Sequence, residues 1–459
     1  MVVNGCLVRQ ISSDTCADFT ALHQLNKERY PYLLESVAYG TPQGRFDIVF
    51  AFPGKTLRLD HLKQLSLPAG DVVDGGDFLK QLDLIWEEER VERAEQASFL
   101  PFSGGWFLFL SYELVSQIEH KLADVLTDEN LPIALATRIP AAIIRDHQNG
   151  NCYFIAEQGG EKLIEMMASD LQQASTLTAS EKAITDSQEE DGADAFLSGV
   201  TRCREYLYDG DVFQVNLSRE YRGKLKTKND YLALYRQLRD CNPAPFAGLA
   251  TFGDSAICSS SPERLVRVHD RHVDMRPIAG TRPRHNDELV DKRLSSELLN
   301  NPKEQAEHVM LIDLIRNDLG RVCQYDSIRV EEDRVLESYT HVHHIVSNVG
   351  GDLVKNTSPG EVIRALFPGG TITGCPKVRC MEIIAELESA PRGAYTGSMG
   401  YLNLNGNMDL NILIRTIVCH KEHYQFRTGA GIVSDSIAEH ELKETRHKAK
   451  GLLRALGTT

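Results

Sequence analysis

The sequence has no apolar run long enough to cross a lipid bilayer and no block of basic residues. Its most apolar stretch, WFLFLSYELV, spans about ten residues and contains Glu113, whereas a membrane-spanning helix needs about 20. The formal net charge is -15, and a nucleic-acid partner would require clustered Lys and Arg. We therefore expect neither a membrane nor a nucleic acid among its partners.

Paired cysteines and a secretory leader are also missing. The 10 cysteines are scattered singly, and the spacing in CPKVRC does not match a common zinc site. The first residues, MVVNGCLVRQ, show no basic segment followed by an apolar core, so no signal peptide is expected. Free thiols without a signal predict a cytoplasmic protein.

What is present is an ordinary globular composition with one clear change along the chain. The 459 residues are 42% hydrophobic and 25% charged, and this length usually means more than one domain. Residues 176–195 are polar and acidic, which predicts a linker or an exposed excursion. We therefore divide the chain into an N-terminal region, 1–175, packed on a catalytic region, 196–459.

The second region alternates short strands with helices. Strands are predicted at 253–260, 263–270 and 272–278, and residues 393–435 read as a strand meander with an Asn-Gly hairpin turn. A helix over 302–320 begins with proline, ends with glycine and buries a face with Val309, Ile312 and Ile315. A second helix over 435–456 begins at a Ser-Asp cap. This mixture indicates an α+β fold.

Each of these two helices carries two glutamates three residues apart. The pairs are Glu304 with Glu307 and Glu441 with Glu444, and this spacing places each pair on one helix face. Such pairs commonly form a solvated charged face. They are also the oxygen ligands that Mg2+ takes beside an anionic substrate, and both interpretations remain open at this point.

Two histidines and two glycine-rich stretches are further candidates. In HVHH, at 341–344, His343 and His344 face opposite sides of a strand and are either structural or general acid-base groups. The glycine-rich segments 367–379 and 427–435 predict turns whose amides bind anions. Arg415 interrupts an apolar strand, as an anion clamp or as the partner of a buried acid such as Asp409.

MRPIAGTRPR, at 275–284, concentrates two prolines and one glycine in ten residues. Such a segment is incompatible with an ordinary helix or a central strand. We predict a turn that bends at Pro277, Gly280 and Pro283.

Several motifs then occur together in a fixed order. They are SPERLVR, RPIAGTRPR, AEHVMLIDLIRNDLGR, HHIVS, FPGGTITGCPKVRCMEII, GSMGYL, MDLNILIRT and GAGIVSDS. With them the chain resembles the chorismate-utilising enzymes over about 200–455, and more weakly in the N-terminal part. This family includes component I of anthranilate synthase and of aminodeoxychorismate synthase, and the isochorismate and salicylate synthases. The resemblance implies an α+β fold of two packed antiparallel β-sheets flanked by helices.

The resemblance also implies chorismate as substrate and Mg2+ as cofactor. Glu307 and Glu444 would be the principal Mg2+ ligands, supported by Glu304 and Glu441 directly or through water. The ion would bind the ring carboxylate and, as a Lewis acid, would help the C4 hydroxyl to leave. His344 would assist the departure of that hydroxyl.

Further residues are placed around the substrate by the same resemblance. Arg415 and the amides of Gly429, Ala430 and Gly431 would hold the enolpyruvyl carboxylate. The other expected site residues are Glu263, Thr281 and Lys377 as catalytic groups, and Ala279, Gly280, Thr371 and Tyr395 as substrate-binding groups.

Gln214 indicates the nucleophile. Family members that add water carry a lysine at the start of this strand, whereas the present sequence, FQVNLSR, has Gln214 there. Glutamine is no base, but its amide accepts from and donates to ammonia. Since no cysteine lies in a GxCxG nucleophile turn, we expect a separate glutamine amidotransferase subunit, component II, as partner.

Different parts of the sequence favour different ring carbons, C2 or C4, as the one that receives ammonia. Ala279 of PIAGT is typical of anthranilate synthases, which aminate C2, whereas aminodeoxychorismate synthases, which aminate C4, carry lysine there. GRFDIVFAFP, DVFQVNLSREY and NPAPFAG are closer to the aminodeoxychorismate synthases. Because these stretches span more positions, we expect 4-amino-4-deoxychorismate for 4-aminobenzoate and folate biosynthesis, with anthranilate formation, or an inactive binding homologue, as alternatives.

One N-terminal motif suggests a second ligand site. Glu35 and Ser36 belong to LLES, and in anthranilate synthases this segment forms the tryptophan site for feedback inhibition. They are therefore a candidate tryptophan pocket, and a plain β-strand edge is the alternative.

Overall fold

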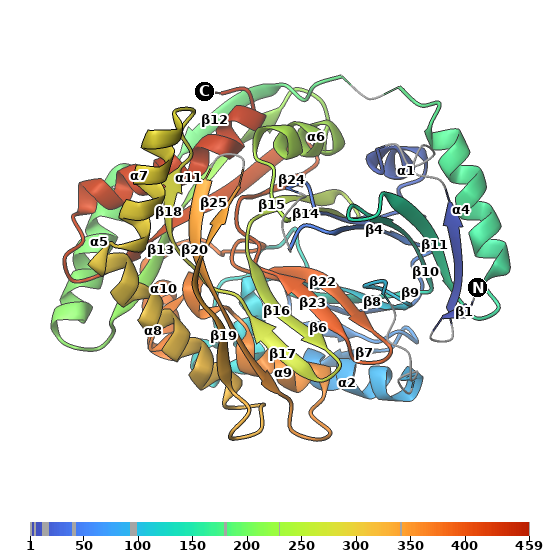
Figure 1. Ribbon diagram of the computed structural model, residues 1–459, viewed down its shortest axis with the longest axis horizontal. Coiled ribbons are helices and arrows are strands. Elements are labelled where there is room, and N and C mark those ends of the chain that lie inside the picture. Colours follow the sequence, from blue (N-terminus) through green and yellow to red (C-terminus); the bar gives the residue numbers. More distant parts are fainter. Residues whose placement is uncertain are drawn as a thin grey trace.

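The computed structural model describes residues 2–3, 6–11, 18–38, 43–91, 99–178, 181–228, 230–339 and 342–458. It confirms the predicted fold class, because two large antiparallel β-sheets pack together with helices on the outside (Figure 1). No helix in these ranges combines the length and the apolar character needed to span a bilayer.

The first sheet contains 13 strands among the described residues, in the order β1-β2-β11-β10-β4-β3-β14-β15-β24-β25-β13-β12, with β21 paired to β13. Its strands come from the whole length of the chain. Their bounds are β1 Val2–Val3, β2 Cys6–Ile11, β3 Tyr32–Glu35, β4 Phe46–Ala51, β10 Ala141–Asp146, β11 Asn151–Glu157, β12 Thr185–Glu190, β13 Gln214–Leu225, β14 Phe246–Phe252, β15 Ser255–Ser261, β21 Gly374–Cys375, β24 Thr416–His420 and β25 His423–Ile432.

The second sheet contains 12 strands among the described residues, in the order β18-β20-β17-β16-β23-β22-β8-β9-β5-β6-β7, with β19 paired to β20. Like the first sheet, it combines strands from 1–175 with strands from 196–459. Their bounds are β5 Thr56–Leu59, β6 Gln64–Ser66, β7 Val72–Asp74, β8 Gly105–Leu110, β9 Ala134–Ile139, β16 Arg264–His269, β17 His272–Met275, β18 Ile278–Pro283, β19 Arg329–Ser338, β20 Val342–Asp352, β22 Ser398–Asn403 and β23 Met408–Asn411.

Helices lie outside these sheets, with α4 beside β10 and β11 and α2 beneath the second sheet (Figure 1). Among the described residues, short 3-10 turns cover Tyr112–Leu114, His120–Leu122 and Gly370–Ile372. The α-helices are α1 Thr20–Leu25, α2 Phe78–Glu89, α3 Val115–Ile118, α4 Glu161–Ala174, α5 Ala193–Tyr208, α6 Tyr231–Cys241, α7 Glu288–Leu299, α8 Pro302–Leu319, α9 Pro359–Leu366, α10 Lys377–Leu387 and α11 Ala438–Ala455.

The apolar run around Trp106 shows how the layers form. It becomes the fully buried strand β8, whose side chains alternate between two cores. Phe107 and Phe109 enter the core between the sheets, where they meet Phe50 and Met399. Trp106 and its neighbours on the same face enter the core that α2 and α9 cover. A strand buried on both faces needs such an unbroken apolar sequence.

Several local predictions are confirmed and others are wrong. The three short strands, the Asn-Gly hairpin and both long helices are present. However, part of 176–195 is not a linker, because 185–190 forms β12 at the edge of the first sheet. Val309 is 52% exposed, because His308 takes the buried position on α8. Helix α11 begins after Ile437 without a side-chain cap.

The cysteines are mostly free, as predicted. Free thiols are Cys6, Cys203, Cys241, Cys258, Cys323, Cys375, Cys380 and Cys419. Cys152 differs, because it is disulfide-bonded.

Candidate active site

The candidate site lies where α8 and α11 meet the sheets, and Gln214 at the start of β13 contacts Glu307 of α8 there; Figure 1 shows both helices on the same side of the molecule. Strand β25 pairs with β13, and β18 pairs with β20. Helix α8 contacts β18 and β20, and α11 contacts β25. The two helices with predicted glutamate pairs are thereby brought to the strands with the other predicted residues.

Glu307 is the centre of a group of like charges. Burial, together with the nearby carboxylates of Glu304 and Glu444, raises the pKa of Glu307. Opposing groups are the Gln214 amide, whose Nε2 donates to Glu307 Oε1 at 3.4 Å, and the ammonium of Lys448. The structure therefore brings three of the four predicted glutamates into one electrostatic field, from both helices.

The partners of these carboxylates are cations of the chain. Arg282 Nη1 lies 3.2 Å from Glu304 Oε1, and Lys448 Nζ lies 2.7 Å from Glu444 Oε1. In the described ranges no three His, Cys, Asp or Glu side chains are gathered closely enough to hold a metal ion as they stand. The oxygen donors nevertheless suit Mg2+ in kind, and the mutual repulsion that raises the pKa of Glu307 is what a cation would relieve.

His344 faces Thr281 across β18 and β20. The Thr281 hydroxyl lies 2.9 Å from His344 Nδ1, and the ring of Tyr339 packs edge-on against the imidazole. Burial lowers the pKa of His344 to about 4, and the charge of Arg415 acts in the same direction. His344 is therefore neutral at pH 7. His343 points elsewhere, to Asp291 and Ser338, and His341 lies outside the described residues.

The segment predicted as a turn at 275–284 is instead an edge strand with a bulge. Ile278–Pro283 forms β18 at the end of the second sheet, which explains how its proline is tolerated. Pairing shifts between Ala279 and Thr281, and Gly280 has φ +71°. A Cβ on Gly280 would lie 2.7 Å from Glu304 Oε2, so glycine lets the carboxylate approach. Ala279 is buried and pairs with Ile345.

Glu263 lies on the loop between β15 and β16, fully within the protein. Thr371 donates to its Oε1 at 2.8 Å. Burial raises the pKa of Glu263 to about 7, against the opposing influence of the Thr371 hydroxyl, Lys448 and Arg415. Such a carboxyl can exist in either protonation state near neutral pH, as an acid-base group requires.

Arg415 has a strained backbone and an uncommitted side chain. Its φ is +53°, which is rare for a non-glycine residue and frequent at functional sites. Asp409 pairs with Arg264 instead, and within the described residues the Arg415 guanidinium makes neither an ion pair nor a hydrogen bond. Burial lowers its pKa, while Tyr395, Glu444 and Glu263 oppose that effect. The arrangement fits an anion clamp.

The second glycine-rich segment is strand rather than turn up to Ile432. Asn216 lies opposite Gly431, and its main-chain amide donates to the Thr373 carbonyl instead of to β25. Ser218 lies opposite Gly429, and its amide donates to Glu388.

Both pairs are therefore of the non-hydrogen-bonded kind, and the amides of Gly429 and Gly431 point away from β13. Strand β24 ends its pairing at Phe426, so on that side the described residues offer the two glycines no strand partner. Ala430 alternates with the glycines and faces β13, which makes its amide unsuitable as an anion donor.

Gln214 and Tyr395 lie against these glycines. A Cβ on Gly431 would come within 2.4 Å of Gln214 Nε2, and one on Gly429 within 2.6 Å of the Tyr395 hydroxyl. Lys448 Nζ donates to the Gly429 carbonyl at 3.0 Å. The lysine is a site residue that the sequence reasoning missed, although its position four residues after Glu444 was a usable signal.

Lys377 is placed differently from the prediction. Helix α10 does begin after Pro376, as expected. However, Lys377 Nζ lies 2.6 Å from Asp318 Oδ2 on α8 and 3.4 Å from the Leu366 carbonyl. The ammonium is occupied by this ion pair, because burial of Asp318 makes a counter-charge necessary.

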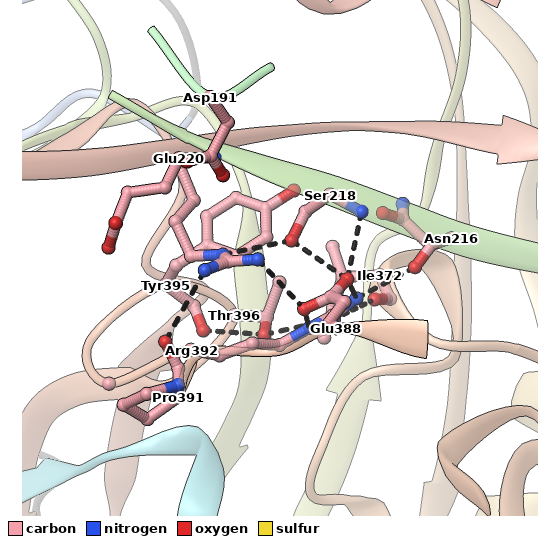
Figure 2. A network of polar contacts seen from close by, with 12 residues as sticks. Asp191, Asn216, Ser218, Glu220, Ile372, Glu388, Pro391, Arg392, Tyr395 and Thr396 are labelled. Carbon is pink, nitrogen blue, oxygen red and sulfur yellow. Dashed lines mark hydrogen bonds and ion pairs between the residues drawn. The ribbon is translucent and has the colours of Figure 1, made fainter. Parts of the chain in front are cut away.

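A buried polar network supports the site from behind β13 (Figure 2). Glu388 accepts from the Ser218 amide at 2.8 Å, from Arg392 Nη2 at 2.7 Å and from Arg427 Nη2 at 3.1 Å. Arg392 also donates to the Asn216 carbonyl at 2.7 Å, as Figure 2 shows. Nothing in the sequence spacing identified this network as a whole, because these members come from three separate segments, on β13, after α10 and on β25.

Glu35 and Ser36 line a separate cavity of about 430 Å³ between the sheets. The Ser36 hydroxyl donates to the Phe46 carbonyl, and Glu35 Oε1 forms an ion pair with Arg239 Nη1 at 3.0 Å. Strand β3 lies between β4 and β14, so LLES is not a sheet edge. The role of this cavity as a tryptophan pocket stays a prediction.

Comparison with known proteins identifies the family. The sequence model of the family described as chorismate binding enzyme matches residues 34–454, which is most of the chain. This protein belongs to the chorismate-binding enzymes. It is accordingly an enzyme that acts on chorismate.

Relatives of this chorismate-binding enzyme carry two different names. Anthranilate synthase component 1 of Thermus thermophilus is 38% identical, over 93% of this chain and 92% of that protein. Aminodeoxychorismate synthase component 1 of Bacillus subtilis is 40% identical, over 80% of each chain.

Solved structures agree with the family. Anthranilate synthase component I of Streptococcus pneumoniae superposes with a TM-score of 0.77 at 31% identity, covering 90% of this chain and 93% of that one. The menaquinone-specific isochorismate synthase of Escherichia coli shares the fold, with a TM-score of 0.74 at 18% identity over 99% and 95% of the two chains.

Proposed function

We propose that this chorismate-binding enzyme is component I of an aminodeoxychorismate synthase. It would convert chorismate and ammonia to 4-amino-4-deoxychorismate. The observation that carries the amination is Gln214, whose amide lies between Glu307 and Gly431 where water-adding members of the family place a lysine. A glutamine side chain cannot deprotonate water, but it can hold ammonia.

The side chains suggest how chorismate is held. Arg415 and the outward amides of Gly429 and Gly431 would bind the enolpyruvyl carboxylate, and Tyr395 would add its hydroxyl. Because His344 is neutral, it would assist the departing hydroxyl as an N–H hydrogen-bond donor rather than as an imidazolium. Glu263 would serve as the acid near the ring.

The same proposal includes Mg2+. Glu304, Glu307, Glu441 and Glu444 would hold the ion, which supplies Lewis-acid stabilisation of the leaving oxygen when bound. Arg282 and Lys448 now neutralise two of these carboxylates, so they would exchange partners when the ion is present.

We also propose a glutamine amidotransferase subunit as partner. The relatives named above are components of synthases, and in this chain no cysteine occupies a nucleophile turn. Free ammonium at alkaline pH would then replace the partner. A cytoplasmic location is consistent with this role.

Anthranilate synthesis is the second candidate, favoured by Ala279. This buried residue takes the place of the lysine expected of the C4-aminating members, and relatives that match more than nine-tenths of the chain are named anthranilate synthases. If C4 is aminated, the reaction must proceed without a covalent lysine at this position.

One experiment separates these functions. The protein is incubated with chorismate, Mg2+ and ammonium, with and without a 4-amino-4-deoxychorismate lyase. We expect 4-aminobenzoate only when the lyase is added. Fluorescent anthranilate without the lyase would establish the second candidate, and unchanged chorismate in every reaction would refute the enzymatic proposal.

A further inference from the structure

Asn216 is buried beside the proposed reaction site, and its side-chain oxygen has no partner. The residue is 8% exposed, and its Oδ1 makes no hydrogen bond to the described residues. An unsatisfied buried amide costs free energy, and native proteins seldom retain one without a function.

Both main-chain polar groups of Asn216 are held by hydrogen bonds. Its amide donates to the Thr373 carbonyl at 2.9 Å, and its carbonyl accepts from Arg392 Nη2 at 2.7 Å (Figure 2). The backbone position is therefore fixed by Thr373 and by Arg392 of the Glu388 network. With the backbone fixed, only the side-chain rotamer of Asn216 has to be ordered when a ligand binds, which lowers the entropic cost of binding.

The position of Oδ1 directs it to the substrate side of β25. A Cβ on Gly429 would lie 2.5 Å from Asn216 Oδ1 and 2.6 Å from the Tyr395 hydroxyl. Gln214 precedes Asn216 by two residues on β13, so both side chains share a face. Gln214 Oε1 is a second buried acceptor without a partner.

We infer that Asn216 and Gln214 together form the binding site for the ammonia nucleophile. This inference rests on the proposed amination. Chorismate presents mainly acceptor oxygens, for which Arg415 and the glycine amides provide donors. Ammonia presents three N–H donors and one lone pair, and its donors match the two unpartnered amide oxygens of Gln214 and Asn216, of which Gln214 lies beside the Glu307 carboxylate. Holding ammonia through its hydrogens leaves the nitrogen lone pair free to attack the ring.

The test is a kinetic comparison of Asn216→Leu with the wild type, using ammonium chloride at saturating chorismate and Mg2+. Leucine has the shape of asparagine without the acceptor. We expect the KM for ammonium to rise about tenfold, the change that corresponds to one hydrogen bond, while the KM for chorismate is unchanged. Because no existing bond is lost, Tm should not fall.

Asn348→Leu is the matched control. Asn348 is also 8% exposed, but its Nδ2 donates to Glu331 at 2.7 Å on β20 and β19. This variant should lower Tm and leave the KM for ammonium unchanged. If Asn216→Leu does not fold, Asn216→Ser retains a shorter acceptor and should still raise the KM for ammonium selectively.

Two results would overturn the inference. One is an unchanged KM for ammonium in the folded Asn216 variants, and the other is a rise in the KM for chorismate instead. Failure of the proposed function looks different, because then the wild type itself would not aminate chorismate with ammonium.

Discussion

The Thr281 hydroxyl lies 2.9 Å from Nδ1 of His344, and the two residues come from paired strands of the second sheet. This contact holds the imidazole in a buried position where its charged form is disfavoured. Its pKa of about 4, compared with 6.5 in an exposed histidine, has a consequence for stability.

His344 should destabilise the protein at acid pH. Its pKa is lower in the folded than in the unfolded state, so unfolding takes up a proton as pH falls from 6.5 towards 4. The free energy of unfolding should therefore fall over that window by about 3 kcal/mol from this residue. Denaturant titrations of His344→Gln should not show this fall in the free energy of unfolding. His269→Gln, at an exposed position, should retain it; equal pH dependence in all three proteins would contradict the assignment.

Glu263 should have the opposite pH dependence. Its pKa is raised to about 7 from 4.5, so its contribution to stability is present below 4.5 and is lost as pH rises through 7. In the wild type this residue should lower the free energy of unfolding by about 3 kcal/mol between these two pH values, and Glu263→Gln should not show that fall. Thermal unfolding of the substrate-free proteins at pH 5 and pH 8 would measure the difference. A wild type and variant that differ equally at both pH values would count against a buried, titrating Glu263.

The glutamates of α8 and α11 should control metal dependence. Glu307→Gln and Glu444→Gln should each abolish Mg2+-dependent turnover while circular dichroism shows an intact fold, because the amide removes a charged ligand but keeps its shape. Glu439→Gln, at an exposed position on α11, is the control and should keep full activity. Full activity in either test variant would remove that residue from the ligand set.

Arg415 should contribute to chorismate binding. Arg415→Lys keeps a positive charge but loses the planar fork that pairs with a carboxylate. We expect kcat/KM for chorismate to fall about 100-fold, which corresponds to loss of a charged hydrogen bond. Arg222→Ala, whose side chain is 63% exposed on β13, should have no effect. A similar loss in both variants would indicate a general electrostatic effect instead of a clamp.

The network of Glu388 should matter for stability. Glu388→Gln leaves Arg392 and Arg427 buried without their counter-charge, and the free energy of unfolding should fall by about 3–5 kcal/mol. The exposed pair of Arg293 and Glu297 on α7 provides the comparison, since Arg293→Ala should cost less than about 1 kcal/mol. Equal changes in chemical denaturation would show that burial does not strengthen the Glu388 pairs.

Sequence reasoning succeeded where spacing or motif carries the information. The presence of α8 and the hairpin after β22 follow from local signals in the sequence, and the family motifs predict the sheet architecture. It failed where contacts join distant segments. Lys377 was assigned to the substrate, but its partner Asp318 is 59 residues earlier and becomes adjacent only through helix packing.

The glycine-rich segment at 427–432 shows a second kind of failure. Glycine commonly indicates a turn, yet here the glycines are strand residues that leave room for Gln214, Asn216 and Tyr395. The glycines in the sequence indicate that side chains must be absent at these positions, but not which neighbouring residues require it. Only the register of β13 with β25 reveals which neighbours occupy it.

The order of strands in both sheets also governs how the chain can fold during synthesis. Strands β22 and β23 join β8 to β16, and β24 and β25 join β15 to β13. These central strands lie within residues 398–432, so a ribosome has made most of the chain before either sheet can become continuous. Such long-range pairing slows folding and leaves apolar strand edges exposed meanwhile. The emerging polypeptide should therefore depend on chaperones, and fragments that end before β22 should aggregate.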